Sequence, residues 1–221
     1  MKRVTLTRET PRNNALLLRL ERLCDVAEVP LTSTRLVGHE DFEFALRALD
    51  VSPRTVVVTS ARAATSAASV KALFPSAAVV AVGNVTKRAL EEVGLTEVAI
   101  APEESAASIA SMSLADPVVS VGASSPRPEL AEALAAAALV HRHLVAYETI
   151  ACQLTVEEEE RLASSDVVVI AAPSAWRVAA PFVRANSLVV AIGATTAGEV
   201  RKTHSKVVIA SQVDDIVAAA I

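Results

Sequence analysis

The chain has 221 residues, of which 52% are hydrophobic and only 3% aromatic, and its formal net charge is −4. So few aromatic side chains argue against a stacking platform for nucleic-acid bases or a flavin ring, and the lack of a long basic run argues against nucleic acid as a partner. The N-terminus turns polar too early for a signal peptide, and no stretch reaches the roughly 18 apolar residues of a membrane span, so we expect a soluble, cytoplasmic protein with no membrane partner.

Short β-branched runs bounded by turn residues alternate with helical patterns along the chain. In chain order, the expected strands are residues 3–7, 28–31, 55–59, 78–82, 97–101, 118–122, 144–147, 166–171, 188–192 and 206–210. The expected helices are residues 11–23, 41–48, 63–73, 85–93, 127–138, 156–163, 175–183 and 195–202. This alternation predicts an α/β protein with doubly wound parallel sheets and a flavodoxin-like strand order.

Three positions carry signals for helix ends. Pro11 opens the first expected helix, and Gly94 follows the fourth as a C-cap. Thr155 precedes an acidic run that ends at Glu160. We interpret this run as a capped first turn whose acids complement the helix dipole, rather than as a metal or acid–base site.

The two halves of the chain repeat one pattern. Residues 81–86 (AVGNVT) return as 191–196 (AIGATT), each an apolar strand, a glycine, a short polar turn and a helix that begins near a threonine. Further matches occur in the same order between residues 4–12 and 119–127, 56–63 and 168–175, and 98–101 and 207–210. This is a duplication of an α/β unit, which favours two small domains with a ligand cleft between the copies.

Several familiar signatures are missing. No G-x-G-x-x-G motif is present, and Gly193 and Gly198 have phosphate-loop spacing but are followed by Glu199 where a lysine is required. His141 and His143 alternate as on a strand without a third ligand nearby in sequence, so we interpret them as an exposed strand edge rather than a metal site. An FMN- or NAD-dependent enzyme is therefore disfavoured.

Polar residues remain at the expected carboxyl ends of strands, where open α/β sheets bind ligands. They are Arg8, Ser60, Arg62, Thr86, Ser174 and Thr196. The helix starts beside them offer backbone N–H groups that favour anions, although each Ser or Thr could instead simply cap its helix. Arg62 is harder to explain by packing, because the sister repeat has Ser174 at the matching position.

Taken in order along the chain, the sequence motifs resemble those of the uroporphyrinogen-III synthase family over essentially the whole chain. The blocks that carry the resemblance are residues 4–23, 29–31, 57–63, 81–86, 127–130, 145–149, 172–175 and 191–197. Two departures occur: Gly193-Ala194-Thr195-Thr196 stands where Gly-Pro-Thr-Thr is common, and Ala172-Pro173-Ser174 stands where Ser-Pro-Ser is usual.

The resemblance implies two flavodoxin-like domains joined by a two-stranded linker. The first domain would comprise residues 1–32 plus 150–221, the second residues 36–144, and the linker strands would be 29–35 and 144–149. It also implies a hydro-lyase of tetrapyrrole (haem) biosynthesis that cyclises hydroxymethylbilane to uroporphyrinogen III. In that reaction water is lost and the last pyrrole ring is inverted, without a cofactor or metal.

By the same resemblance, Tyr147 is the candidate for assisting departure of the hydroxyl. The expected substrate-binding residues are Arg8, Ser60, Arg62, Thr86, Ser174, Thr195 and Thr196. We expect a monomer that contacts the hydroxymethylbilane-producing enzyme transiently. The alternative is a non-catalytic two-domain sensor that closes on a small anionic ligand, because such a protein would share every fold-level feature.

Overall fold

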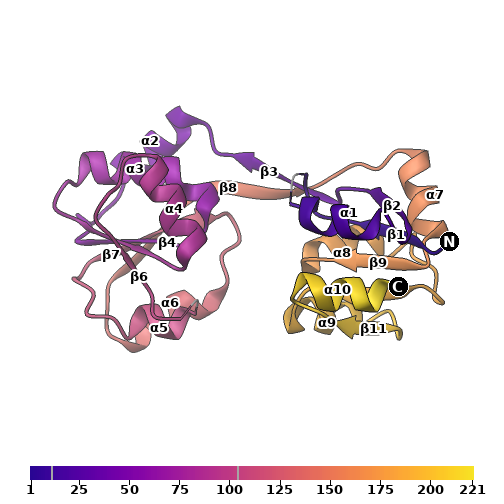
Figure 1. The fold of residues 1–221 in the computed structure, drawn as a ribbon. Coiled ribbons are helices and arrows are strands. Elements are labelled where there is room, and N and C mark those ends of the chain that lie inside the picture. The colour runs from indigo at the N-terminus through magenta and orange to yellow at the C-terminus, as the bar shows by residue number, and fades with distance from the viewer. Residues whose placement is uncertain (11, 104) are drawn as a thin grey trace. The chain divides into compact units, whose positions relative to one another are not determined.

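The computed structural model describes residues 1–10, 12–103 and 105–221, and the chain folds into two compact units. One unit combines Met1–Ser33 with Ile150–Ile221, and the other is Thr34–Thr149 (Figure 1). Pro11, which was expected to open the first helix, lies outside the described residues. Within those ranges, no helix is both long and apolar enough to cross a membrane.

The discontinuous unit is built on a parallel five-stranded sheet. Its strands are β1 (Arg3–Leu6), β2 (Asp25–Glu28), β9 (Val167–Ile170), β10 (Leu188–Ala191) and β11 (Val207–Ile209). They lie in the order β2-β1-β9-β10-β11, so the chain crosses over once and then progresses outward. This is the flavodoxin-like order expected from the sequence.

Helices cover both faces of this sheet, because the strands are apolar on both sides. Helices α1 (Asn14–Leu20) and α10 (Val213–Ala220) pack on one face through Leu16, Leu20 and Ile216. Helices α7 (Val156–Ser164), α8 (Pro173–Ala179) and α9 (Ala194–Val200) pack on the other, where Trp176 is 3% exposed. At the surface, Arg19 of α1 and Asp214 of α10 form an ion pair of 2.6 Å.

The second unit contains a six-stranded sheet in the order β3-β8-β7-β4-β5-β6. Its strands are β3 (Thr32–Leu36), β4 (Thr55–Val58), β5 (Ala78–Ala81), β6 (Val98–Ile100), β7 (Val118–Ala123) and β8 (His141–Ala151). Counted from β7, the order β8-β7-β4-β5-β6 is the same flavodoxin-like arrangement, with the chain entering it two strands later. The match between residues 4–12 and 119–127 reflects this, since β7 holds the place that β1 holds in the other unit.

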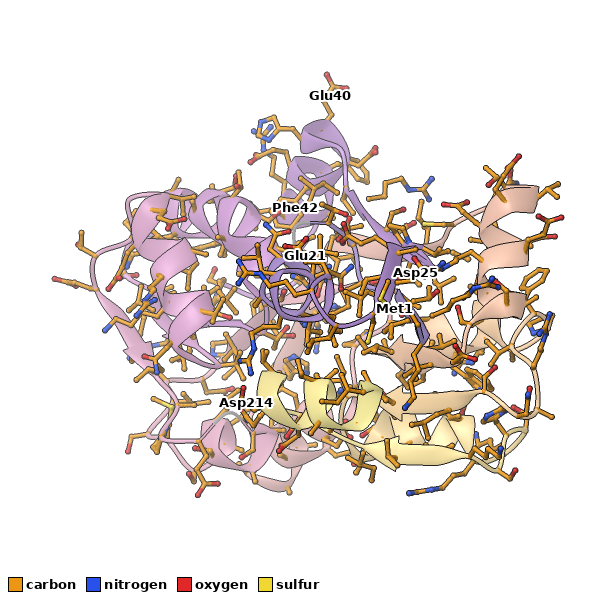
Figure 2. The ribbon with its side chains drawn as sticks, turned by 45° about the vertical axis from the view of Figure 1, so that its right-hand side comes forward. Met1, Glu21, Asp25, Glu40, Phe42 and Asp214 are labelled. Atoms are coloured by element: carbon orange, nitrogen blue, oxygen red, sulfur yellow. The ribbon has the colours of Figure 1, made fainter. Side chains whose placement is uncertain are left out.

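Both faces of the second sheet are also covered. Helices α2 (His39–Arg47), α3 (Ala64–Leu73) and α4 (Asn84–Glu92) pack on one face, with the short 3-10 helix η1 (Ala61–Ala63) leading into α3. Helices α5 (Ala106–Ala110) and α6 (Pro128–Ala136) cover the other through Ile109 and Leu134. On α2, Phe42 is 2% exposed in the core, whereas Glu40 projects away from the helix (Figure 2).

Strands β3 and β8 are hydrogen-bonded neighbours that connect the two units (Figure 1). The Val37 backbone N–H donates to the Ala146 carbonyl at 3.0 Å, and the Cys152 N–H donates to the Leu31 carbonyl at 3.0 Å. As one residue number falls the other rises, so the two strands run antiparallel. The chain therefore passes between the units on this pair of strands.

The expected fold class is confirmed, and so are two of the helix-end signals. Thr155 and Glu158 form a reciprocal capping box at the start of α7. Gly94 has φ +91° and ends α4, with the Leu95 N–H reaching back to the Leu90 carbonyl. Helices α5 and α10 were not predicted, and β8 is much longer than expected because it pairs with β7 along its first part and lies beside β3 farther on.

Candidate functional site

In the unit formed by residues 34–149, the carboxyl ends of β4 and β7 lie next to each other at one edge of the sheet, and β7 ends beside Tyr147 of β8. Ser60 and Arg62 follow β4, and Tyr147 lies on β8. Ser60 caps η1, where its hydroxyl oxygen accepts a hydrogen bond from the Arg62 N–H at 3.3 Å. The sequence predicts Ser60 as a substrate-binding residue, and in the structure its side chain caps a helix, which is the alternative that the sequence left open.

Arg62 and Tyr147 come together at this edge. The Arg62 guanidinium carbon lies 5.6 Å from the centroid of the Tyr147 ring, which is cation–π distance. Tyr147 is 7% exposed and its ring packs in the core of the unit, whereas Arg62 is half-buried. Because β7 separates β4 from β8, the pairing spans the end of β7.

The structure also gives Thr86 a place at the same edge. Thr86 follows β5, the neighbour of β4 on its other side, and lies in the first turn of α4, which contacts η1. It is 4% exposed and does not cap the helix, because Gly83 occupies the N-cap position without a side-chain hydrogen bond. Simple capping therefore does not account for Thr86.

The remaining predicted residues belong to the unit that contains both termini. Arg8 follows β1, Ser174 lies in the first turn of α8 after β9, and Thr195 and Thr196 lie in the first turn of α9 after β10. Thr196 is 3% exposed and Thr195 is exposed. The N-caps of α8 and α9 make no side-chain cap bond, so neither Ser174 nor Thr196 acts as an N-cap.

Gly193 sets the turn that precedes these threonines. Its φ of +90° lies in the left-handed region, which a residue with a Cβ rarely adopts. The equivalent Gly83 is extended at φ −165°, so the two repeats make this turn differently.

Sequence reasoning misread one cluster. His141 and His143 are half-buried rather than exposed, and both rings bond to the hydroxyl of buried Ser120, through His141 Nε2 and His143 Nδ1, each at 2.8 Å. The other ring nitrogen of His143, Nε2, lies 2.8 Å from the Ala123 carbonyl oxygen. The alternating His-x-His spacing showed that the rings share one face, but the serine that joins them comes from a different strand.

Burial is the main cause that lowers the pKa of His141 below its ordinary value of 6.5, and the charges of His143 and Arg142 lower it further. Arg142 itself points to the opposite face of β8 and forms a two-pronged ion pair with Asp50, at 2.8 and 2.7 Å. That pair raises the pKa of Arg142 and lowers that of Asp50. The neutral form of His141 is thus favoured in the folded protein.

Within the described part of the chain, no three His, Cys, Asp or Glu side chains gather where a metal ion could be held. A surface hollow of about 530 Å³ lies along α2, beside His39, Glu43, Phe44 and Arg47. It contains none of the predicted site residues. The carboxyl edges of the two sheets therefore remain the places where the candidate polar groups concentrate.

Two flavodoxin-like parallel-sheet units, joined by paired strands, define an α/β protein of two domains with polar residues at the carboxyl ends of its strands. The family model for uroporphyrinogen-III synthase HemD matches residues 19–218. The chain belongs to this family.

Solved structures show the same fold at low sequence identity. Uroporphyrinogen-III synthetase from Helicobacter pylori is 16% identical with a TM-score of 0.70, and the match covers 100% of this chain and 98% of that one. A mutant uroporphyrinogen III synthase from Thermus thermophilus is 18% identical with a TM-score of 0.63, over 99% of this chain and 96% of that one. No curated protein matches the chain significantly.

Proposed function

We propose that this chain is a uroporphyrinogen-III synthase, which cyclises hydroxymethylbilane with loss of water and inversion of the last pyrrole ring. The observation that carries the proposal is the family match, which extends over residues 19–218 and so includes both units. The pairing of Arg62 with Tyr147 supports it, because a cation and a phenol at a strand edge suit an anionic substrate that loses a hydroxyl group.

The chemistry explains why the chain needs no catalytic triad. The electron-rich pyrrole stabilises the azafulvenium cation that forms when the hydroxyl group leaves, so departure itself is easy. The enzyme must instead hold the chain so that the substituted carbon of the last ring attacks this cation and gives a spiro intermediate. This is a task of proximity and orientation, which distributed contacts can perform without a cofactor.

We assign Tyr147 as the group that donates a hydrogen bond to the departing hydroxyl. The eight carboxylates of the substrate would be bound by the two arginines and the hydroxyl-bearing helix starts. These residues are Arg8, Ser60, Arg62, Thr86, Ser174, Thr195 and Thr196. With a net charge of −4, the protein repels such an anion at long range, so short-range donors must supply the attraction.

The test is an assay of product isomers. The purified protein is added, without metal, flavin or nicotinamide, to a reaction that produces hydroxymethylbilane, and the products are oxidised and separated by chromatography. We expect mainly the type III isomer, whereas uncatalysed closure gives type I. Type I product alone, from folded protein, would contradict the proposal and favour the sensor alternative.

Variants then test the assigned roles. Tyr147→Phe should lower turnover by about 10–100-fold, at or below the low end for general acid assistance because the leaving group departs readily. Arg62→Ala should raise KM. Thr86→Ala should raise KM mildly, and the matched Thr86→Ser, which keeps the hydroxyl, should not. Loss of all turnover on one binding-residue substitution would contradict distributed binding.

A further inference from the structure

Tyr147 faces Arg62 only because strand β8 contains a bulge. Up to Val145, strands β7 and β8 pair in regular register, with Val121 opposite Leu144 and Gly122 opposite Val145. The register then shifts, so that Ala123 stands opposite Tyr147 and Ala146 is the extra residue. A bulge of this kind re-aims the side chains that follow it.

The backbone hydrogen bonds show the same change. At the start of β8 the carbonyl of an even-numbered residue, Val140, accepts from the Val118 N–H on the β7 side. At the bulge, the carbonyl of even-numbered Ala146 instead faces β3 and accepts from the Val37 N–H. The Tyr147 carbonyl faces β7 and accepts from the Ser124 N–H at 2.8 Å. Without the bulge, the Tyr147 side chain would lie on the face of His143 and Val145, away from Arg62.

Ala123 is the β7 residue opposite Tyr147. Its backbone carbonyl points away from β8, beyond the last residue of β4 that pairs with β7. The Val121 carbonyl accepts from the Thr59 N–H, and the Ala123 carbonyl, two residues on, points the same way beyond the end of β4 at Val58. His143 supplies the missing donor with its Nε2 at 2.8 Å. The ring passes over Gly122, whose added Cβ would stand 3.5 Å from His143 Cε1.

Ser120 holds the His143 ring in that position. Since a carbonyl oxygen only accepts, His143 Nε2 carries a proton, and in the neutral ring Nδ1 must accept from the Ser120 hydroxyl at 2.8 Å. The Ser120 oxygen can then accept from His141 Nε2, also at 2.8 Å. Ser120 is 1% exposed, so the hydroxyl that joins the two rings is shielded from water.

We propose that His143, held by Ser120, is a positioning residue for Tyr147: it anchors the end of β7 through the Ala123 carbonyl and so fixes the bulge that turns the phenol towards Arg62. That the aimed phenol serves catalysis rests on the proposed function. The geometric part does not, because it concerns only where the Tyr147 ring lies.

Two substitutions separate the two bonds of the His143 ring. His143→Gln keeps an amide N–H near the position of Nε2, so it can still donate to the Ala123 carbonyl. His143→Asn places its amide oxygen near Nδ1, so it can accept from Ser120 but no longer reaches Ala123. If His143 only filled space or stabilised the fold, His143→Gln would not be expected to behave like the wild type while His143→Asn does not.

Tyr147 is the chain's only tyrosine, so a fluorinated tyrosine incorporated biosynthetically gives one fluorine NMR signal that reports its ring. We expect His143→Asn to shift or broaden this signal and His143→Gln to leave it close to that of the wild type. In the product assay, His143→Asn should lower kcat by about tenfold with KM nearly unchanged, because an aimed hydroxyl acts in the transition state.

An unchanged fluorine signal in folded His143→Asn would overturn the proposal, and so would equal shifts in both variants. If His143→Asn does not fold, Ser120→Ala takes its place. Removing the Ser120 hydroxyl frees the His143 ring and should broaden the fluorine signal of Tyr147. An unaltered signal in Ser120→Ala would overturn the proposal. Failure of the wild type to form type III product would remove the proposed function, while the fluorine comparison would still decide the positioning role.

Discussion

The Arg62–Tyr147 contact should contribute measurable coupling energy to the unit formed by residues 34–149. Cation–π pairs are worth about 0.5–1 kcal/mol when exposed and about 2 kcal/mol when desolvated. With a guanidinium 5.6 Å from the ring centroid, a half-buried arginine and a ring 7% exposed, we expect about 1 kcal/mol. Arg62 has a further interaction and Tyr147 packs in the core, so neither single substitution isolates the pair.

A double-mutant cycle isolates it. Arg62→Met keeps the length of the side chain and removes the charge, and Tyr147→Leu removes the ring. The free energies of unfolding of the four proteins are measured by denaturant titration, with Trp176 fluorescence identifying the transition of the other unit. Repeating the cycle with Tyr147→Phe, which keeps the ring, should give almost no coupling. If the effects of Arg62→Met and Tyr147→Leu add to within about 0.3 kcal/mol, the contact contributes no measurable coupling energy and the prediction is wrong.

Three further predictions concern stability in the same unit. Ala138 follows α6 with a positive φ of +57°, as Gly94 follows α4 with φ +91°. Ala138→Gly should therefore raise the free energy of unfolding by about 1 kcal/mol, and Gly94→Ala should lower it by a similar amount. Urea titrations in which both substitutions change the free energy of unfolding in the same direction would contradict this. Because the pKa of His141 is lowered from 6.5, the folded protein binds fewer protons than the unfolded one below that pH. The free energy of unfolding should therefore fall as the pH drops from 6.5 through the lowered pKa of His141. His141→Gln should show a weaker pH dependence, and a pH profile identical to that of the wild type would refute this. A Cβ at residue 122 would stand 2.6 Å from Thr59 Oγ1, so Gly122→Ala should cost about 1–3 kcal/mol, and Thr59→Ala should recover most of that loss in thermal unfolding.

The predictable part of the fold is the part that local pattern controls. The runs 56–58 in β4 and 167–170 in β9 are continuous and apolar, and both strands are fully buried between helices. Because a parallel strand covered on both faces needs no polar residues, such runs can be recognised without knowing their neighbours. The Thr155 capping box is equally local, since both of its bonds join residues three apart.

Two helices were missed because their patterns are weak. Helix α5 has only five residues, and α10 ends in a run of alanines that has no polar face to mark a helical period. Tertiary packing decides both, through Ile109 under one sheet and Ile216 against the other.

From the sequence alone came the fold class, the family resemblance and the candidate polar residues at strand ends, because apolar periodicity, turn residues and ordered motifs are properties of neighbours along the chain. The pairing of Arg62 with Tyr147, the bulge at Ala146 and the bond from His143 to Ala123 were decided only in three dimensions. A one-residue change of register reverses which face a side chain takes, and register depends on the partner strand. No local pattern in β8 contains that information, since half of each bond is supplied by another strand.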